Sequence, residues 1–339
     1  MPRPTTNKQW TLAKRPHGMI SAENWKLSEA PVPQLADGEA LVETLYLSCD
    51  PTQRGWMEDR PSYMPPVAIG EVMRAGSVGR VIESRAASLA PGDLVEGMAG
   101  WQQYSVVKAG GPFGATKLPA GTDPKLLMSV LGVTGLTAYF GLLDLGQPKA
   151  GETVVVSGAA GATGSIAGQI ARLSGCRVIG IAGGPEKCAW LTKQARFDAA
   201  IDYKRENVSA RLRELAPQGV DVYFDNVGGD ILDAVLEQIR MKARVVLCGG
   251  ISAYNEVTPP PGPRNLMNLV IQRGRMEGFI VIDYVPRFME GREALKKWVD
   301  AGKIAHQVDV VRGIERAPEG LLRLFSGKNL GKQLIQVAE

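Results

Sequence analysis

The chain has 339 residues, of which 45% are apolar and 22% charged, so a mainly disordered protein or a coiled coil is excluded. At roughly 150 residues per domain, this length predicts two domains. The formal net charge of +4 is too small and too dispersed to indicate a nucleic-acid-binding protein. The four cysteines form no CxxC pair and the N-terminus carries no signal-peptide pattern, so we expect a reduced, cytoplasmic protein.

The first part of the chain, up to about Gly121, consists of short segments broken by glycine and proline. Alternating or β-branched residues predict strands over 39–48, 77–84 and 93–98, and the sequence APGD at Ala90–Asp93 predicts a turn. We therefore expect a twisted, mostly antiparallel β domain. The uncharged stretch 126–143 contains several Gly, Ser and Thr residues, so it predicts a buried helix and no membrane span.

After Ala150 the pattern changes to alternating strands and helices. The expected strands are 152–158, 176–183, 199–203, 220–228, 243–250 and 276–283, and the expected helices are 163–174, 186–194, 208–215, 231–240 and 292–301. This spacing predicts βαβ units around a six-stranded parallel sheet. The residues from about Asp309 onward are strand-like again. We expect 129–308 to form a nucleotide-binding domain, and 1–128 with 309–339 to form a catalytic domain.

The clearest local motif is the sequence SGAAGATG at 157–164, between a β-branched strand and a helix. A backbone without side chains lets a pyrophosphate approach closely, and the helix N-terminus behind it offers N–H groups. Gly164 and Gly168, one helical turn apart, would let this helix pack closely on the sheet. The alternative is a tight turn without a ligand, which the strand–turn–helix context disfavours.

The ends of the next strands indicate which dinucleotide binds. NAD-binding folds place an acid after the second strand to hold the ribose 2′-hydroxyl. Here Ile181–Pro185 carries no acid and Lys187 follows, so NADPH, with its 2′-phosphate, is the preferred cofactor. Tyr203, Asn226 and Cys248–Gly250 stand at the ends of the third, fourth and fifth strands, where ligands of such sheets bind. A solvated lysine, a rim tyrosine and turn glycines are the alternative interpretations.

Histidine-dependent chemistry is largely excluded, because His17 and His306 are the only histidines. A zinc alcohol dehydrogenase needs histidine and cysteine ligands, and Gly70-Glu71 lacks the histidine that such an enzyme would carry there. We therefore predict no metal site and no His-assisted nucleophile. Cys248 is interpreted as a small apolar wall in preference to a nucleophile.

Tyr254 is the remaining polar candidate for catalysis. It follows the fifth strand in the sequence GGISAYNE at 249–256. A phenol at this position could donate a hydrogen bond to a substrate carbonyl and stabilise an enolate. The alternative is an exposed loop tyrosine.

Ordered sequence strings across nearly the whole chain carry a family resemblance. They are LSCDPTQRGWM (47–57), PPVAIGEVMRAGSVGRV (65–81), GLTAYFGLLDLG (135–146), SGAAGATGS (157–165), FDAAIDYK (197–204), YFDNVGG (223–229), CGGISAYN (248–255), RMEGFIV (275–281) and KNLGK (328–332). The chain resembles the zinc-free branch of the medium-chain dehydrogenase/reductase superfamily, and within it the group of prostaglandin, alkenal double-bond and bacterial curcumin reductases.

The resemblance implies an α/β fold with a Rossmann-type doubly wound parallel sheet domain and a mainly β, GroES-like catalytic domain. It also implies a homodimer, for which the edge segment Met276–Asp283 could pair across a two-fold axis. The NADPH contacts that it implies are Ala160, Gly161, Ala162, Thr163, Lys187, Tyr203, Asn226, Cys248, Gly249, Gly250, Ile251, Ser252, Ala253, Tyr254, Phe279, Ile280, Val281 and Asn329. Asn329 lies in the returning C-terminal segment and would tie the two domains together across the cofactor.

The leading hypothesis for function is NADPH-dependent reduction of the carbon–carbon double bond of α,β-unsaturated ketones and aldehydes, by hydride transfer to the β-carbon. The alternatives are a quinone oxidoreductase of the same fold and a non-catalytic NADP-binding sensor or structural protein. One departure concerns the substrate: many relatives read Asp-Pro-Tyr-Met-Arg where this chain has Thr52-Gln53 between Pro51 and Arg54. We expect this loop to face the substrate and to make the pocket more polar.

Overall fold

The chain folds into two compact units in the computed structural model, which describes residues 3–111 and 114–339. The β-rich unit holds the described residues up to Met128 together with Val308–Asn329 and Gln333–Glu339. The α/β unit holds Ser129–Gln307 and Leu330–Lys332. Within the described ranges, no helix is both long enough and apolar enough to cross a membrane.

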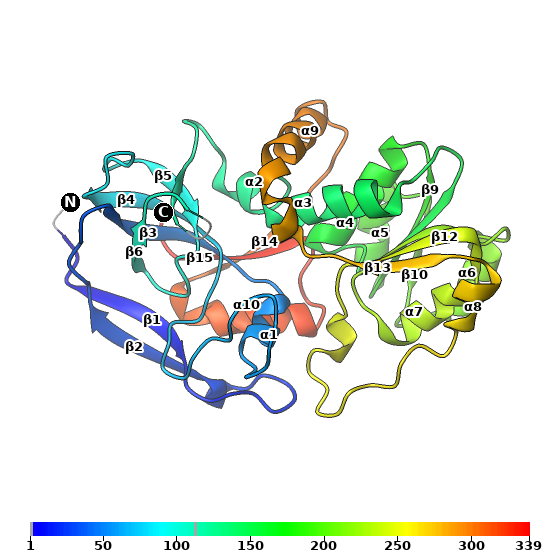
Figure 1. Cartoon of the computed structure of the whole chain (residues 1–339), viewed down its shortest axis with the longest axis horizontal. Helices are drawn as coiled ribbons and strands as arrows, with labels where there is room; N and C mark the ends of the chain where they lie inside the picture. The colour runs from blue at the N-terminus through cyan, green and yellow to red at the C-terminus, as the bar shows by residue number, and fades with distance from the viewer. Residues whose placement is uncertain (1–2, 112–113) are drawn as a thin grey trace. The chain divides into compact units, whose positions relative to one another are not determined.

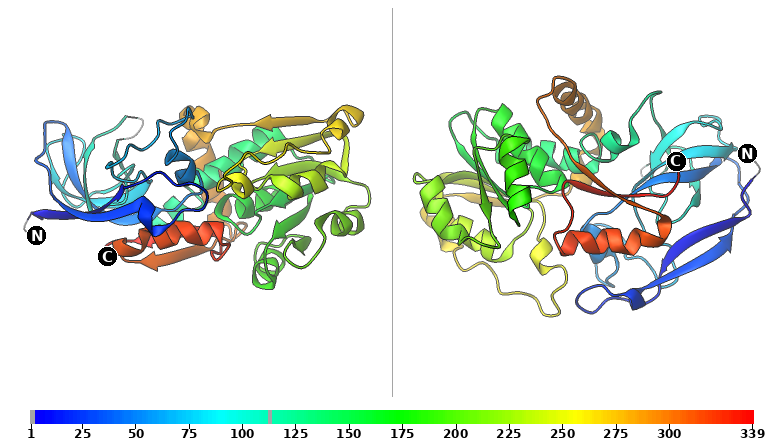
Figure 2. Two further views of the ribbon diagram at one scale, coloured as in Figure 1. Left: turned by 90° about the horizontal axis from the view of Figure 1, so that it is seen from below. Right: turned by 180° about the vertical axis from the view of Figure 1, so that it is seen from behind.

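The β-rich unit contains one large sheet and a two-stranded sheet, and its hairpin-like pair β1–β2 is the blue segment in both views of Figure 2. The large sheet has the order β14-β15-β3-β4-β5-β7, with β6 paired to β3. The strands are β1 Thr6–Leu12, β2 Trp25–Pro31, β3 Glu39–Ser48, β4 Ser77–Ser84, β5 Leu94–Gly97, β6 Tyr104–Lys108, β7 Thr116–Lys117, β14 Val308–Arg312 and β15 Lys332–Gln336. The expected strands 39–48 and 77–84 are confirmed, and β5 is slightly shorter than expected.

The helices of the β-rich unit are short. They are η1 Ala22–Asn24, α1 Thr52–Trp56, α2 Pro124–Met128, η5 Ile314–Arg316 and α10 Ala317–Phe325. The expectation that the last residues are all strand-like is wrong, because α10 lies between β14 and β15. A proline in its first turn favours helix initiation, and Gly320 packs so closely on β15 that an added Cβ would lie 2.4 Å from Cδ1 of Ile335.

The α/β unit is built on a six-stranded parallel sheet, as expected from the sequence. Its order is β10-β9-β8-β11-β12-β13, so the strand order reverses between β8 and β11. The strands are β8 Thr153–Ser157, β9 Arg177–Ala182, β10 Ala199–Asp202, β11 Val220–Asp225, β12 Ile239–Leu247 and β13 Arg275–Gly278. This is the doubly wound arrangement, in which ligands bind at the carboxyl edge where the order reverses.

Helices cover both faces of this sheet, because its central strands are apolar on both sides. Val154–Val156 of β8 are fully buried, for example. Figure 1 shows α3 and α4 on one side of the sheet and α6, α7 and α8 on the other. The helices are α3 Val133–Phe140, the π-helix η2 Gly141–Gly146, α4 Ala162–Leu173, α5 Pro185–Lys193, α6 Val208–Leu215, α7 Gly229–Leu236, η3 Ile251–Ala253, α8 Met267–Ile271, η4 Val281–Arg287 and α9 Phe288–Asp300.

The strand expected over 276–283 is wrong in its second half. β13 ends at Gly278, and the chain continues into η4. The Phe279 ring lies against Gly141, where an added Cβ would be 2.3 Å from Cζ of the ring, and it makes an edge contact with Tyr284. Packing of this aromatic side chain therefore turns the backbone away from the sheet.

The boundary expected between the helix 231–240 and the strand 243–250 is also wrong. The helix α7 ends at Leu236, and β12 already begins at Ile239. Ile239 is buried and pairs with Val220 at the start of β11. Tertiary pairing thus extends the strand over residues that the local pattern assigns to a helix.

Candidate active site

The carboxyl ends of the six parallel strands bring together nearly all the residues singled out in the sequence. Ala160–Thr163 follow β8, Lys187 follows β9, Tyr203 follows β10, Asn226 follows β11, Cys248–Tyr254 follow β12 and Phe279–Val281 follow β13. Asn329 is the exception, because it belongs to the β-rich unit, where it is buried. Its contact with the cofactor stays a prediction.

The turn after β8 is a tight loop that leads directly into α4. Gly158 has a φ of +56°, and the N–H of Gly161 donates to the carbonyl of Gly158 over 2.9 Å. A Cβ on Gly164 would lie 2.5 Å from that same carbonyl oxygen, so only glycine lets the helix approach the turn this closely. Ala162 and Thr163 open the helix, where N–H groups have no intrahelical acceptor.

This turn fits the pyrophosphate of a dinucleotide. Gly158, Gly161 and Gly164 carry no side chain, which lets the backbone of the turn and the start of α4 lie close together, and the positive end of α4 lies behind the turn. Gly331 pairs with it from the C-terminal segment, its N–H donating to the carbonyl of Ala160 over 2.9 Å. Gly168 was expected to let the helix pack closely on the sheet. Instead it makes room for the Phe197 ring, which a Cβ at this position would meet at 2.0 Å.

The ends of β9 and β10 are organised by Asp202, which the sequence analysis missed. Its Oδ1 accepts the N–H of Gly184 over 2.8 Å and the N–H of Lys204 over 3.1 Å. A Cβ on Gly183 would lie 2.9 Å from both the Tyr203 ring and Cε of Lys204. The side chains of Tyr203 and Lys204 therefore cover the tip of β9. The sequence signal that could have identified Asp202 and Lys204 is an acid at the end of a strand that is followed directly by tyrosine and lysine.

The cations at this end of the sheet suit a phosphate group. Lys187 lies in the first turn of α5 and is half-buried, and Lys204 is exposed. Residues Ile181–Pro185 carry no acid, and the carboxylate of Asp202, at the end of β10, already accepts two backbone N–H groups. The arrangement offers charge-assisted hydrogen bonds to a 2′-phosphate and no repulsion from a free carboxylate at the strand tip.

The end of β11 is organised by a second buried acid, Asp225. Its Oδ1 accepts hydrogen bonds from the hydroxyls of Ser157 and Tyr223, both at 2.7 Å. It also accepts the N–H groups of Val227 at 2.9 Å and Gly228 at 3.0 Å. Burial and the charge of Asp225 raise the pKa of Tyr223 well above its ordinary value, so the phenol stays protonated and donates.

Asn226 is held in place by the neighbouring strand β8. Its backbone N–H donates to Oγ of Ser157 over 2.8 Å, and its Nδ2 donates to the carbonyl of Ser157 over 2.7 Å. Because Ser157 is in turn anchored on Asp225, the two central strands are fixed to each other at the point where the strand order reverses.

Tyr254 folds back over the glycines that follow β12. Its hydroxyl oxygen accepts the N–H of Gly250 over 3.2 Å, and a Cβ on Gly249 would lie 3.2 Å from the same oxygen. A phenol that accepts one hydrogen bond still carries a hydrogen to donate. The geometry therefore supports a donor role for Tyr254 at the carboxyl edge of the sheet.

The two cysteines at the carboxyl edge of the sheet, Cys248 after β12 and Cys188 in α5, are poor nucleophiles. Burial, assisted by the charge of Asp225, raises the pKa of the Cys248 thiol to about 12. Burial likewise raises the pKa of Cys188 to about 11. Since the thiolate is the reactive form, these values support the interpretation of Cys248 as a wall of the site.

The Thr52-Gln53 departure has a structural explanation within the β-rich unit. Gln53 is fully buried: its Oε1 accepts the N–H of Asp50 over 3.0 Å, and its Nε2 donates to the carbonyl of Arg74 over 3.0 Å. The segment is thus the short helix α1 and not a loop, and the expectation that Gln53 makes a pocket more polar is wrong, because its side chain is in the interior. Thr52 alone is accessible, with its hydroxyl hydrogen-bonded to that of Tyr63.

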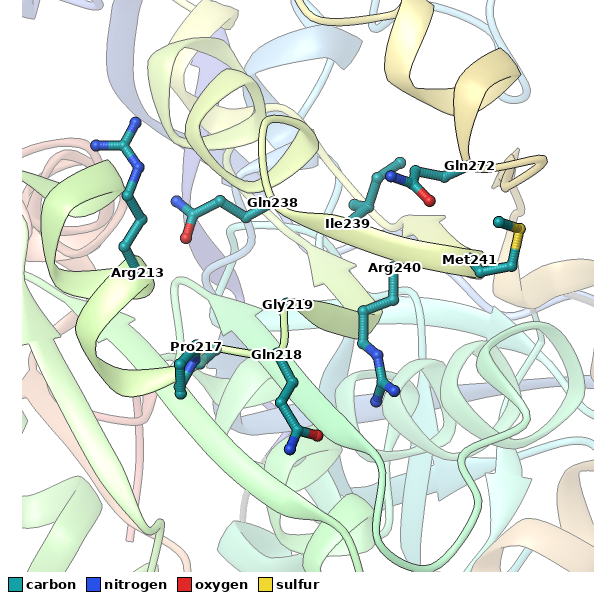
Figure 3. A pocket seen from close by; sticks show the side chains of 10 residues that line it. Arg213, Pro217, Gln218, Gly219, Gln238, Ile239, Arg240, Met241 and Gln272 are labelled. Carbon is teal, nitrogen blue, oxygen red and sulfur yellow. The ribbon is translucent and has the colours of Figure 1, made fainter.

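A separate pocket of about 420 Å³ lies at the opposite, amino edge of the parallel sheet (Figure 3). The labelled side chains come from the end of α6, the loop before β11, the start of β12 and the loop after α8. Both arginines of the pocket already pair with acids, Arg213 with Glu237 and Arg240 with Asp221. Since their charges are neutralised, this pocket is a weaker candidate than the carboxyl edge.

Within the described ranges, no group of three or more His, Cys, Asp or Glu residues is placed to hold a metal ion.

Comparisons with known proteins agree on one family. The description "N-terminal domain of oxidoreductase" matches residues 8–114, and "Zinc-binding dehydrogenase" matches residues 162–299. NADPH-dependent curcumin reductase of Escherichia coli is 43% identical, over 98% of this chain and 97% of that protein. The NADP(+)-dependent 2-alkenal reductase of Nicotiana tabacum is 41% identical, over 88% of both chains.

A solved structure extends the similarity to three dimensions. It is that of CurA from Vibrio vulnificus in complex with NADPH, which is 41% identical to this chain and has a TM-score of 0.93. The match covers 98% of this chain and 99% of that one.

Proposed function

We propose a function for this chain from the family to which it belongs, the zinc-free medium-chain dehydrogenase/reductases of the curcumin and alkenal reductase group. It is an NADPH-dependent reductase of the carbon–carbon double bond in α,β-unsaturated ketones and aldehydes. The relatives named for this chemistry match nearly the whole chain, and a neighbour of almost the same fold carries NADPH. The observation that carries the proposal is the glycine turn after β8, at the reversal of the strand order, with Lys187 after β9 and no acid in Ile181–Pro185.

The α/β unit is proposed to hold the cofactor, which supplies the hydride for the β-carbon. The Ala160–Thr163 turn would bind the pyrophosphate, and Lys187 and Tyr203 the 2′-phosphate. Asn226, Cys248–Tyr254 and Phe279–Val281 would line the nicotinamide half, and Asn329 would add a contact from the β-rich unit. The β-rich unit would supply the substrate side, where the accessible Thr52–Tyr63 pair is the candidate contact.

Tyr254 is proposed as the donor to the substrate carbonyl. When the β-carbon gains a hydride, negative charge moves to the carbonyl oxygen, and an enolate forms. A phenolic O–H close to that oxygen stabilises the charge as it develops. Solvent then protonates the α-carbon, so no strong acid is needed.

A homodimer is proposed from the open edge of the parallel sheet. β13 has β12 as its single described neighbour, and the short helix α8 beside it exposes Met267, Val270 and Ile271 by 64%, 68% and 56%. Such an edge with an apolar flank favours pairing with a second copy. Sedimentation equilibrium should give a mass twice that of the chain. In Val270→Glu the measured mass should fall to that of a single chain. None of the four cysteines forms a disulfide, which supports a reducing, cytoplasmic location.

The decisive experiment is NADPH oxidation by the purified protein with an enone, a quinone and a saturated ketone of similar size. We expect the enone to be turned over with the highest kcat/KM, to give the saturated ketone, and NADH to be a poor replacement. A higher kcat/KM for the quinone would favour the quinone oxidoreductase alternative. NADPH binding without turnover of any enone would favour a non-catalytic protein.

A further inference from the structure

The carboxylate of Asp225 is buried in an unusual way. It is fully inaccessible, and all four of its described hydrogen bonds go to Oδ1. Its other oxygen, Oδ2, is buried and has no hydrogen-bond partner among the described residues. An oxygen that accepts four donors belongs to an ionised carboxylate, because a protonated one would need an acceptor for its own hydrogen.

This buried charge has no counter-ion in the described protein. None of the ion pairs of the described residues includes Asp225, whereas Asp202, at the end of β10, has Nε of Arg205 at 3.9 Å from its Oδ2. A buried carboxylate without a cation costs several kcal/mol, so such a group is retained where it serves a purpose.

The position of Asp225 indicates where a cation would come from. It is the last residue of β11, directly beyond the reversal of the strand order, and its carbonyl accepts the N–H groups of Cys248 at 2.8 Å and Gly249 at 3.1 Å. Its negative charge reaches the Cys248 thiol, whose pKa it helps to raise. A dinucleotide with its 2′-phosphate at β9 and β10 extends its nicotinamide toward the ends of β11 and β12.

We propose that Asp225 is a buried counter-ion for the positively charged, oxidised nicotinamide ring. This inference rests on the proposed function, because it needs the cofactor in the crevice. A hydride leaves the neutral dihydronicotinamide with both electrons of its bond and joins the β-carbon of the substrate. The ring is left with one positive charge, the substrate gains one negative charge on its carbonyl oxygen, and solvent later supplies the proton to the α-carbon.

A fixed carboxylate at the end of β11 would favour this separation of charge in a nicotinamide bound at that edge of the sheet. It is already oriented by four donors before the reaction, so no reorganisation is needed when the positive charge appears. Asp225 thus stabilises the charged form of the ring more than the neutral form, while Tyr254 stabilises the other half of the same charge separation.

The competing explanation is that Asp225 only shapes the turn before α7. The Val227 and Gly228 N–H groups that it accepts lie just ahead of that helix, and a shaping role would need no charge on the ring. The two explanations differ in what they predict for binding. A shaping role affects NADP+ and NADPH alike, whereas a counter-ion discriminates between them.

Isothermal titration calorimetry of the full chain with NADP+ and with NADPH tests the proposal without turnover. We expect Asp225→Asn, which keeps the shape and removes the charge, to raise the ratio Kd(NADP+)/Kd(NADPH) about tenfold. Ser157→Ala removes one donor to the same carboxylate and keeps its charge, so it should leave the ratio at or below the wild-type value. An unchanged ratio in Asp225→Asn, with both affinities weakened equally, would overturn the proposal.

A second variant keeps the test decisive if Asp225→Asn does not fold. Tyr223→Phe retains the buried ring, removes another donor and leaves the carboxylate less screened, so the ratio should fall below the wild-type value. An unchanged ratio or a rise would contradict the counter-ion role. Failure of the wild-type chain to bind NADPH at all would instead refute the proposed function, so the two failures are distinguishable.

Discussion

The two halves of the carboxyl edge of the parallel sheet treat charge in opposite ways. At the ends of β9 and β10 the functional charges are cationic, carried by the half-buried Lys187 and the exposed Lys204. At the ends of β11 and β12 the charge is the buried carboxylate of Asp225, surrounded by hydroxyl and N–H donors. Each half has an acid at the end of one strand, Asp202 on β10 and Asp225 on β11. Of these two acids, Asp202 has a cation nearby, Arg205, and no ion pair of the described residues includes Asp225.

The difference corresponds to the kind of charge that each half would meet. A 2′-phosphate is charged in every state of the cofactor, so flexible surface cations can recognise it on arrival. The charge on a nicotinamide ring appears only as the hydride leaves, so the group that stabilises it has to be fixed beforehand. The cationic half should therefore control which cofactor binds, and the buried half should control how fast it reacts.

The largest expected effect comes from a change at the boundary of the two halves. In Gly164→Ala the new Cβ would stand 2.5 Å from the carbonyl of Gly158 and 2.9 Å from Cα of Ala159, so α4 has to move off the turn. Overpacking of this kind costs about 1–3 kcal/mol of unfolding free energy. We expect kcat/KM to fall about a hundredfold or more with both NADPH and NADH, because the shared pyrophosphate site is displaced.

Thermal unfolding and steady-state kinetics measure both effects. Gly262→Ala is the matched control, since nothing lies within 4 Å of a Cβ at that position. If Gly164→Ala lowered activity with one cofactor only, the turn would not be the site of the pyrophosphate.

The next effect separates the cationic half from the rest. Lys187→Gln should raise KM for NADPH roughly 10- to 100-fold, because a charge-assisted hydrogen bond contributes about 1.5–3 kcal/mol. KM for NADH and kcat should hardly change. Lys193→Gln removes the same charge from the last turn of the same helix and should be silent. Equal losses with NADPH and NADH in Lys187→Gln would contradict a 2′-phosphate contact.

A smaller effect should separate the buried half. Tyr254→Phe removes the donor proposed for the enolate and should lower kcat about tenfold with little change in KM for the enone. The Gly250 N–H also loses its acceptor, so the unfolding free energy should be measured alongside. Tyr254→Ala is the companion variant: if the ring were only a wall, Phe would be silent and Ala would mainly raise KM.

The sequence predicts the cationic half better than the buried half, for a physical reason. The glycine turn, Lys187 and Tyr203 each follow a strand directly, so local pattern and strand order suffice to place them. Asp225 owes its role to the hydroxyl of Ser157, which is 68 residues away and reaches it only because β8 and β11 are neighbours. No local pattern contains that information.

The misplaced elements show the same limit. The strand expected through 283 stops at Gly278, where the Phe279 ring packs on the π-helix at Gly141, far away in sequence. Gln53 was expected in a polar loop that faces the substrate, but it lies in the short helix α1, where backbone groups of Asp50 and Arg74 hold its side chain in the interior. In both cases a tertiary contact overrides the tendency of the local sequence.

The smallest expected effect tests how far the cationic half extends. Lys204 lies with Tyr203 over Gly183, so its ammonium group can supplement Lys187, but it is exposed and its contribution is screened by solvent. Lys204→Gln should raise KM for NADPH about threefold, within the range of about 0.2–1 kcal/mol measured for exposed ion pairs, and the effect should vanish at high salt.

Binding of 2′,5′-ADP and of 5′-AMP, followed by calorimetry at two ionic strengths, isolates the phosphate contribution from the rest of the cofactor. Lys303→Gln, an exposed lysine beyond α9, controls for the loss of surface charge. If Lys204→Gln weakened 5′-AMP as much as 2′,5′-ADP, the lysine would act on the adenosine or on the fold of the loop, and Lys187 would be the one lysine of the two that contacts the phosphate.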